Sequence, residues 1–425
     1  MKIAIIGSGI SGLICAHVLG PHHQVTLYEA DGRLGGHSNT VEVDDPSAGT
    51  IGIDTGFIVH NDRNYPNISA LFAELGVSPV DTEMSFGVAD EASGFYYRAT
   101  SIDTIFADRR NFARPSTYRM VADILAFQRT AKRFLLHGDP TESLGEFLDR
   151  HNYSSTFIDL HLIPMGASIW SADPATFADF PAVALFRFFE NHGLLSVGDR
   201  PQWKSLVGGS RSYVDEIVSR FSGTIQMSTP VESIERTPDH VTVQSAAGTN
   251  DYDSVVLACH SDQALQLLTD PSSTETDVLG AIRYQPNTAT LHTDTSVLPA
   301  AEKAWSAWNY FRHADGRDAG SAVLTYDMNV LMGIDAQNRY LVSLNDPRID
   351  PSKVLYETTY AHPVFDRPAL LAQSRVTEVS GKNRTHYAGA YWGYGFHEDG
   401  MASGLRACRE LGTPWEFDTI AQATS

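Results

Sequence analysis

The chain has 425 residues, of which 42% are hydrophobic and 19% charged, a composition that excludes disordered, collagen-like and coiled-coil classes. Lys and Arg number 31 and Asp and Glu 51, so the formal net charge is −20. Such an acidic chain is a poor general binder of nucleic acid, because phosphates attract basic groups. At about 150 residues per domain, the length predicts two to three domains.

The first 30 residues predict a β–α–β unit. Lys2–Ile6 is a short, β-branched, apolar run that is typical of a buried parallel strand. The run GSGISG follows directly as Gly7–Gly12, and Leu13–Leu19 predicts a short helix. Gln24–Tyr28 predicts a second strand, and Glu29 stands at its end.

The rest of the chain divides into stretches of different character. A hairpin is expected over residues 41–53, residues 66–205 have a mostly helical pattern, and residues 224–258 alternate as successive strands. Residues 385–411 predict a strand, a loop rich in glycine and aromatic residues, and a helix. The tail after about residue 412 is expected to be disordered.

Neither a metal site nor a membrane span is indicated. The three cysteines lie far apart without a CxxC pair, and the 16 histidines show no metal-ligand spacing, so no metal is predicted. There is no run of about 18 apolar residues. Met1 and Lys2 lead directly into the first strand without the features of a signal peptide, and we therefore expect a cytoplasmic protein.

The run Gly7–Gly12 has the context of a dinucleotide-binding turn. A strand precedes it, a helix begins within it, and the acidic Glu29 follows Gly12 by 17 residues at the end of the next strand. Gly7 permits the tight turn, Gly9 lets the backbone approach a pyrophosphate, and Gly12 lets helix and strand pack closely. Glu29 would accept hydrogen bonds from a ribose diol. A glycine-rich turn in a nucleotide-free α/β domain is the alternative.

Two further segments favour a flavin over a nicotinamide dinucleotide. Gly35-Gly36 lies where a second backbone pass could reach the pyrophosphate. Near the other end of the chain, a helix starting near Gly400 would aim its positive end at the N1 and C2-carbonyl region of a reduced flavin, which carries negative charge. Asp399 could instead be only the N-cap of that helix, and the two interpretations are compatible.

The motifs GSGISG, GRLGGH, IDTGF and AGAYWGYGFHEDGMASGL resemble the flavin-containing amine oxidase and phytoene desaturase superfamily. Over nearly the whole chain, runs such as DTGFIVHNDRNYPN and RPQWKSLVGGSRSY are similar to a bacterial subgroup of predicted NAD/FAD-binding proteins, some of which are associated with fatty-acyl modification. The resemblance implies FAD as the cofactor. It also implies an α/β fold, in which a Rossmann-type FAD-binding domain is assembled from separated segments and carries an inserted α+β substrate domain.

The resemblance also implies the residues that contact FAD. His37 stands where the family usually has Arg, and Ala390 stands where an acidic residue often follows the glycine, so these individual contacts are weakened. The predicted FAD-binding residues are Gly7, Gly9, Ser11, Gly12, Glu29, Ala30, Arg33, Gly35, Gly36, His37, Thr55, Gly56, Val231, Gly389, Asp399, Gly400 and Ala402.

Hydride transfer to a flavin needs mainly a dry, positioned C–H bond, so the expected substrate site is aromatic and apolar. The loop YWGYGFH supplies the candidate catalytic residues Tyr391, Trp392 and His397. Ordinary core packing is the alternative for the aromatic side chains, and loop capping for His397. Further candidates for the pocket wall are Tyr65, Trp203, Lys204, Tyr284, Trp308 and Tyr310.

Two departures from the family pattern count against simple amine oxidation. His397 stands where many amine oxidases have a tyrosine, and residues 287–294, where their flavin-linked lysine would fall, contain no lysine. No second GxGxxG occurs on a strand–helix unit, which favours electrons that arrive from the substrate as hydride. Oxygen, a quinone or a carrier protein would then be the acceptor.

One segment of this acidic chain is basic. Residues 98–133 hold eight Lys or Arg against three Asp, a net charge of +5, which leaves −25 on the remainder. From Thr117 the pattern is amphipathic, and a basic amphipathic helix can rest on anionic lipid. A core-facing helix with a solvated basic face is the alternative.

We therefore expect an FAD domain formed by residues 1–65, 205–270 and 375–415, and a substrate domain formed by residues 66–204 and 271–374. The expected function is an FAD-dependent oxidoreductase that takes hydride from a carbon of an apolar small-molecule or lipid substrate, such as a modified fatty-acyl chain. Oxidative deamination of an amine, with release of ammonia and hydrogen peroxide, and non-redox flavin-dependent isomerisation are the alternatives.

Overall fold

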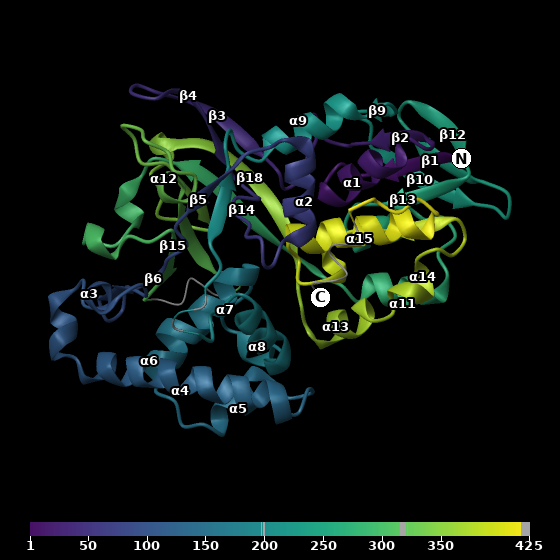
Figure 1. Ribbon diagram of the computed structural model, residues 1–425. Coiled ribbons are helices and arrows are strands. Elements are labelled where there is room, and N and C mark those ends of the chain that lie inside the picture. Colours follow the sequence, from purple (N-terminus) through teal and green to yellow (C-terminus); the bar gives the residue numbers. More distant parts are fainter. Residues whose placement is uncertain (197, 199, 315–319, 321, 418–425) are drawn as a thin grey trace.

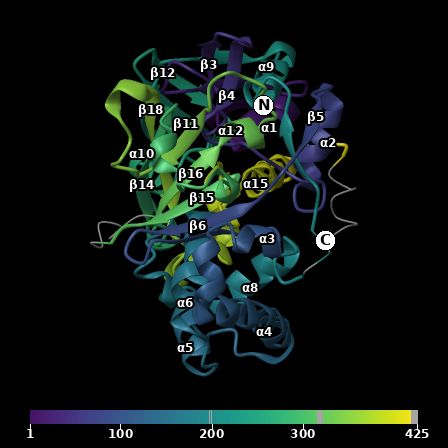
Figure 2. The same cartoon turned by 90° about the vertical axis from the view of Figure 1, so that its left-hand side faces the viewer.

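The computed structural model describes residues 1–196, 198, 200–314, 320 and 322–417 (Figures 1 and 2). Its largest elements are a parallel sheet near the N-terminus, a mixed sheet, and a helical region formed by residues 102–191. Within the described residues, no helix is long and apolar enough to cross a membrane. Trp415 lies in the tail that was predicted to be disordered, yet it is buried and donates to Glu74; residues 418–425 of that tail lie outside the described part.

A five-stranded sheet, parallel throughout, confirms the predicted α/β fold. Both faces are covered, because Ile3 and Ile5 of β1 point into one hydrophobic cluster while Ala4 and Ile6 point into another. The strands, in spatial order, are β19 (Thr385–Tyr387), β13 (Ser254–Leu257), β1 (Lys2–Ile6), β2 (Gln24–Tyr28) and β9 (Thr224–Gln226). The three segments expected to form the FAD domain therefore all supply strands to one sheet, although the domain limits remain a prediction.

Helices cover one face of the parallel sheet and a small antiparallel sheet covers the other. The first group is α1 (Ile10–Leu19), α2 (Pro66–Leu75), α9 (Arg211–Arg220) and α15 (His397–Glu410). The antiparallel sheet is β10 (Val231–Arg236), β11 (Val241–Ser245) and β12 (Gly248–Tyr252), as the alternation predicts. Beside it lie α10 (Ser261–Leu267), α11 (Ser273–Gly280), α13 (Arg367–Gln373) and α14 (Val376–Val379).

A seven-stranded mixed sheet lies between the parallel sheet and the helical region. Its strands, in spatial order, are β18 (Val354–Pro363), β14 (Tyr284–His292), β17 (Leu341–Leu344), β16 (Val323–Asp327), β15 (Trp308–Arg312), β6 (Phe86–Asp90) and β7 (Phe95–Arg98). β14 and β18 pair along their whole lengths, from Tyr284 opposite Pro363 to His292 opposite Val354. The short helix α12 (Met328–Leu331) follows β16 directly.

The helical region packs around an aromatic core that includes Phe127, Phe147 and Phe186. Its helices are α3 (Ile102–Ile105), α4 (Pro115–His137), α5 (Leu144–Asp149), α6 (Ser155–Phe157), α7 (Ile163–Trp170) and α8 (Ala182–Asn191). The 3₁₀ turn Arg109–Ala113 precedes α4, and a π-helical turn joins α6 to α7.

The mostly helical prediction for residues 66–205 is wrong in part. Besides β6 and β7, this stretch contains β5 (Pro79–Thr82) and the start of β8 (Trp203–Leu206), which pair with each other. Each of these strands is short and pairs with a distant partner or in a small hairpin, so local periodicity carries little signal for it. The predicted hairpin is confirmed as β3 (Thr40–Asp45) and β4 (Gly49–Asp54).

Candidate active site

A cavity of about 1310 Å³ runs from the glycine-rich turn after β1 to the helical region. The turn contributes Gly7, Gly9 and Ser11, and the far wall comes from α4, α7 and α8. Ligands of open parallel sheets bind beyond the carboxyl ends of the strands, which is where this cavity lies against the sheet. Its volume exceeds the roughly 300–1,000 Å³ of ordinary ligand pockets, so it has room for a dinucleotide and a further molecule.

The three glycines of the turn differ in what surrounds them. Gly7 has φ +102°, and a Cβ there would lie 2.9 Å from the carbonyl oxygen of Ala258. At Gly12 a Cβ would lie only 1.9 Å from the carbonyl oxygen of Gly7, because α1 packs directly on the turn. A Cβ at Gly9 would meet nothing within 4 Å, since Gly9 faces the cavity. Gly9 thus leaves open space where the N-terminus of α1 begins.

Glu29 lines the cavity at the end of β2, and its carboxylate is held on both sides. Oε2 accepts hydrogen bonds from the backbone N–H and the hydroxyl of Ser8, and Oε1 accepts from the N–H of Asp31 at 2.9 Å. Ala30 and Val231 line the same part of the cavity. The structure therefore brings together three of the residues that were predicted to contact FAD.

The segment after Glu29 passes across the first turn. Gly36 has φ +57°, and a Cβ there would lie 3.1 Å from the Cα of Gly9. Arg33 donates a hydrogen bond to the carbonyl of Gly36 at 2.7 Å, which fixes this close crossing. Arg33, Gly36 and Gly56 line the cavity, whereas Gly35 packs behind it with its N–H bonded to the carbonyl of Ser8.

Helix α15 joins the two ends of the chain at this site. The Ser11 hydroxyl donates to the carbonyl of Gly400 at 2.8 Å, and Cβ atoms at Gly400 and Gly404 would clash with α1. The helix begins at His397, about one turn before Gly400, so Asp399 is its third residue and not its N-cap. The Asp399 carboxylate accepts from the N–H of Phe396 at 2.9 Å, and burial raises its pKa to about 7.

Several predicted site residues do not line the cavity. Thr55 instead bonds Asn39 and the hydroxyl of Tyr360, so it positions a cavity residue. Ala402 is exposed, because two helical residues rotate it about 200° from Gly400, which faces α1. The predicted residues outside the lining are Gly12, Gly35, Thr55, Trp392, Asp399, Gly400 and Ala402.

Of the candidate catalytic residues, Tyr391 and His397 line the cavity and Trp392 does not, which corrects the prediction for Trp392. A 3₁₀ turn at Ala390–Trp392 sends the indole into the core beside Arg406, whose guanidinium lies 5.6 Å from the ring. Tyr391 is buried, and its hydroxyl has no hydrogen-bond partner among the described residues.

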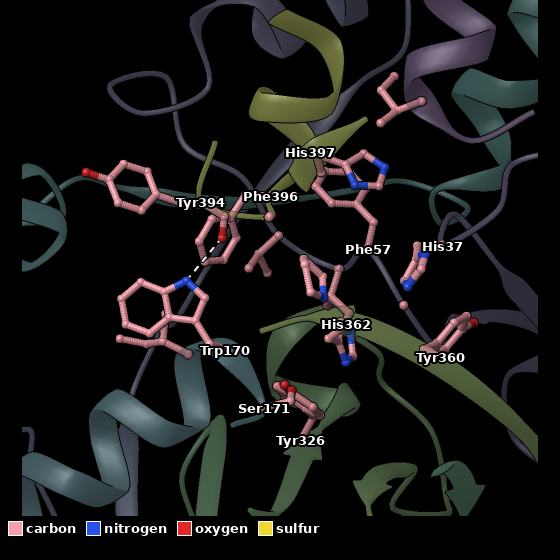
Figure 3. A pocket seen from close by; sticks show the side chains of 18 of the residues that line it. His37, Phe57, Trp170, Ser171, Tyr326, Tyr360, His362, Tyr394, Phe396 and His397 are labelled. Carbon is pink, nitrogen blue, oxygen red and sulfur yellow. Dashed lines mark hydrogen bonds between the residues drawn. The ribbon is translucent and has the colours of Figure 1, made fainter. Parts of the chain in front are cut away.

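His397 is held by hydroxyl groups on one side and by an aromatic ring on the other. Its Nε2 lies 2.9 Å from Ser38 Oγ and 3.1 Å from Tyr213 Oη, and its ring stacks on Phe57 at a centroid distance of 3.8 Å (Figure 3). Burial lowers its pKa to about 3, so the imidazole is neutral at physiological pH.

A group of histidines that the sequence did not single out as a cluster faces the same cavity. The His37 ring stacks on Tyr360 at 4.6 Å and lies 5.6 Å from His362, measured between ring centroids (Figure 3). The His260 ring lies 6.3 Å from His37. Burial lowers the pKa of all three histidines, to about 4 for His362, and the His260 ring further disfavours charge on His37 and His362. Only His37 had been predicted to contact the cofactor, because His362 comes from β18, far along the chain.

The wall of the cavity in the helical region is mostly apolar, although Gln128, His161 and Ser171 also line it. We call Ile124, Leu125, Phe127, Met165 and Ile169 of α4 and α7 the helical wall. The Trp170 indole N–H donates to the carbonyl of Tyr394 at 3.1 Å, which ties α7 to the aromatic loop (Figure 3).

Among the described residues no lysine lines the cavity, and Lys204 pairs instead with Asp62. Of the other predicted wall residues, Tyr65, Trp203, Tyr284 and Trp308 line it and Tyr310 does not. No group of three or more His, Cys, Asp or Glu in the described part of the chain could hold a metal ion.

Comparisons with known proteins agree with this arrangement. Residues 10–332 match the sequence profile of a family described as flavin containing amine oxidoreductase, while no curated protein matches the chain. Cyclohexylamine oxidase from Brevibacterium oxydans IH-35A is similar in structure, with a TM-score of 0.69 at 16% identity over 96% of this chain and 98% of that one.

Two further solved structures each have a TM-score of 0.67. A putative protoporphyrinogen oxidase from Exiguobacterium sp. 255-15 is 18% identical over 97% of this chain and 99% of its own. A CLA-producing fatty acid isomerase from P. acnes is 16% identical over 96% of this chain and 98% of its own. At such identities these likenesses show the fold alone.

Proposed function

Because the chain belongs to the flavin containing amine oxidoreductase family, it is an FAD-dependent oxidoreductase, and we propose that it removes hydride from a carbon of a fatty-acyl chain or a similar apolar chain. The observation that carries the proposal is the helical wall, which gives the cavity a long apolar side opposite the glycine-rich turn. FAD, when bound, supplies the acceptor for the hydride and its two electrons.

The residues present fit FAD. Gly9 leaves open space beside the start of α1, where free backbone N–H groups attract phosphate, while the neighbouring Gly12 is tightly packed. Glu29, Gly36 and Val231 line the same end and would hold the adenosine and pyrophosphate. The flavin end would lie toward His37, whose ring faces the cavity.

The substrate side of the cavity is suited to an uncharged chain. Ile124, Phe127 and Ile169 exclude water, and a water-free site favours hydride transfer from a positioned C–H bond. His362 and His397 add no positive charge, because burial keeps both imidazoles neutral. These side chains would orient and enclose the substrate. The carbon that loses hydride would form a double bond as the neighbouring carbon loses a proton, and the neutral imidazoles of His362 and His397 are the lining groups placed to accept that proton.

Amine oxidation is the second candidate. Tyr394 and Phe396 line the cavity beside His397, and aromatic faces attract cationic amines. Against it, the described lining holds no lysine, and His397 occupies the place of the family's aromatic-cage tyrosine.

Anaerobic mixing of the purified holoenzyme with a panel of substrates tests the proposal. Long-chain acyl compounds should bleach the absorbance of the oxidised flavin, and short-chain compounds and primary amines should not. Bleaching by amines alone, with ammonia and hydrogen peroxide released in air, would establish amine oxidation instead. A rearranged acyl product with fully oxidised flavin at the end would establish isomerisation, the activity in the printed name of one structural neighbour.

A matched pair of variants connects the result to the helical wall. Met165→Trp would fill cavity space at the helical wall, of which Met165 is a member, whereas Leu371→Trp adds the same ring on the outside of α13, where Leu371 is 60% exposed. The first should slow flavin bleaching by long chains at least tenfold, and the second should leave it unchanged.

A further inference from the structure

We propose that the outer face of α4 and the turn before it docks on an anionic lipid bilayer. We call this surface the docking face. Its residues are Arg109, Phe112, Tyr118, Leu125, Arg129, Lys132, Arg133 and Leu136. The inference concerns where the protein binds and does not require the proposed substrate to be correct.

The docking face carries large apolar side chains in contact with solvent. Leu136 is 75% exposed, Tyr118 52%, Phe112 49% and Leu125 43%. Tyr118, Leu125 and Leu136 are spaced by seven and eleven residues, so they lie on one side of α4 along about 27 Å. Four of the ten large hydrophobic residues that the described chain exposes this strongly therefore lie in one short segment.

The same surface is basic because its acidic residues are turned inward or paired elsewhere. Asp108 and Asp123 are buried and bind Arg110 and Arg119, each at 3.0 Å, while Asp103 pairs with Lys303. Within the described chain, Arg109, Arg129 and Arg133 have no ion-pair partner.

Apolar residues interleaved with cations match an anionic membrane surface, because apolar side chains enter the headgroup region while Lys and Arg meet lipid phosphates. Arg109 lies 5.9 Å above the Phe112 ring, which places one of each kind together. An acidic protein is the alternative partner, because its carboxylates would also pair with the cations of the docking face. The surface of a folded protein, however, has no hydrocarbon layer into which Leu136 and Tyr118 could insert.

The docking face continues into the cavity. Val121, Ile124 and Gln128 of α4 line the cavity, and Leu125 both lines it and is exposed at the surface. An apolar chain could therefore pass from a bilayer along α4 into the cavity with little exposure to water. Figures 1 and 2 both show α4 at the outer edge of the helical region, away from the parallel sheet.

The net charge of −20 does not prevent this binding. At physiological ionic strength the Debye length is about 8 Å, so only charges close to the contact influence the lipid. The parallel sheet lies at the opposite end of the molecule from α4 (Figure 1).

Sedimentation of the FAD-loaded protein with sucrose-filled vesicles tests the proposal. One set contains phosphatidylglycerol in phosphatidylcholine, and the other contains phosphatidylcholine alone. We expect binding to the anionic set that weakens with added salt, and at least tenfold weaker binding to the neutral set. Absence of wild-type binding to anionic vesicles would overturn the proposal and leave the face to an acidic protein partner.

A matched pair of double variants locates the contact. Arg133→Gln/Leu136→Asp alters the docking face, and Arg367→Gln/Leu371→Asp makes the same changes on the exposed side of α13. Both lower the net charge by two, yet only the first should weaken anionic-vesicle binding, by at least about tenfold. An equal loss in both pairs would show that α4 is not the contact and would overturn the proposal.

Folding of each variant is checked by retained flavin absorbance and melting temperature. If the first double variant unfolds, Arg129→Gln/Arg133→Gln removes two exposed cations without adding an acid. It should weaken binding about thirtyfold, and unchanged binding would overturn the proposal. Vesicle binding is measured without turnover of a substrate. A failure of the membrane-docking proposal is therefore distinguishable from a failure of the proposed function.

Discussion

Gly9 and Gly12 of the first turn should respond to the same substitution in opposite ways. Gly12→Ala would place a methyl group 1.9 Å from the Gly7 carbonyl oxygen, where ordinary contact begins at about 3.4 Å. Helix α1 would have to move by about 1.5 Å, and overpacking of this kind costs roughly 1–3 kcal/mol or more. For a chain of this length, 3 kcal/mol lowers the melting temperature by about 3 °C.

Gly9→Ala should instead leave the empty protein intact. Its φ of −62° suits alanine, and the new methyl group would meet no protein atom within 4 Å. Alanine makes the unfolded chain stiffer, which stabilises the folded state, but it is a weaker N-cap than glycine, which destabilises the helix. These two effects roughly cancel, so the free energy of unfolding should change by less than about 1 kcal/mol. The methyl group would, however, occupy space beside the start of α1, and FAD affinity should fall at least tenfold, or about 1.4 kcal/mol.

Thermal unfolding of the flavin-free proteins and titration of each with FAD separate the two effects. The wild type serves as reference in both measurements. If Gly9→Ala binds FAD as tightly as the wild type, the pyrophosphate does not lie against Gly9. If Gly12→Ala has the same melting temperature as the wild type, α1 is not packed on the turn as described.

Three further predictions concern a buried ion pair, a buried carboxyl group and the helical wall. Glu275 and Arg236 form a buried ion pair, so Glu275→Gln should cost about 3–5 kcal/mol in urea unfolding at pH 7, and a wild-type value would contradict this. Burial alone would raise the pKa of Glu275, but the hydrogen bonds from Arg236, Tyr387 and Ser272 together outweigh it and lower the pKa to about 2. This contribution should therefore disappear as pH falls from 4.5 through about 2. The pKa of Asp399 is raised to about 7, so ionisation of this carboxyl group disfavours the folded state. Between pH 4 and 7, the wild type should therefore lose up to about 4 kcal/mol of stability relative to Asp399→Asn. If the stability difference between the two proteins is the same at pH 5 and pH 8, this prediction is wrong. Ile169→Trp should lower kcat/KM for long acyl chains more than for short ones, and an equal effect on both would argue against the helical wall as the substrate surface.

Local sequence predicted those parts of the fold in which consecutive residues all indicate the same element. Lys2–Ile6 and Gln24–Tyr28 are short runs rich in β-branched and apolar residues, with a glycine-rich turn and a short helix between them, and the structure has both strands at these bounds. β5 pairs with β8 more than 120 residues away, and neither has the length or alternation to be recognised alone. Their pairing depends on tertiary contacts, which override local preference.

The same limit applies to the site. Gly7, Gly9 and Glu29 follow from spacing, because each has a distinct steric or hydrogen-bonding role near the others in sequence. Neighbours such as Tyr391 and Trp392 point to opposite sides, and the 3₁₀ turn that separates them has no signature in the aromatic composition. His362 reaches the cavity only because β18 pairs along the full length of β14, so no local pattern could have identified it.

The position of β1 has a consequence for synthesis on the ribosome. β1 pairs with β2 within the first 28 residues. The other edge of β1 stays unpaired until β13 has been synthesised, and the outer edge of β13 stays unpaired until β19, near residue 385, has been synthesised. At 5–20 residues per second, translation of the 425 residues takes roughly 20–85 s. During most of that time the nascent chain exposes the unpaired edge of an apolar strand, so productive maturation should depend on chaperone binding to this edge until β19 has emerged.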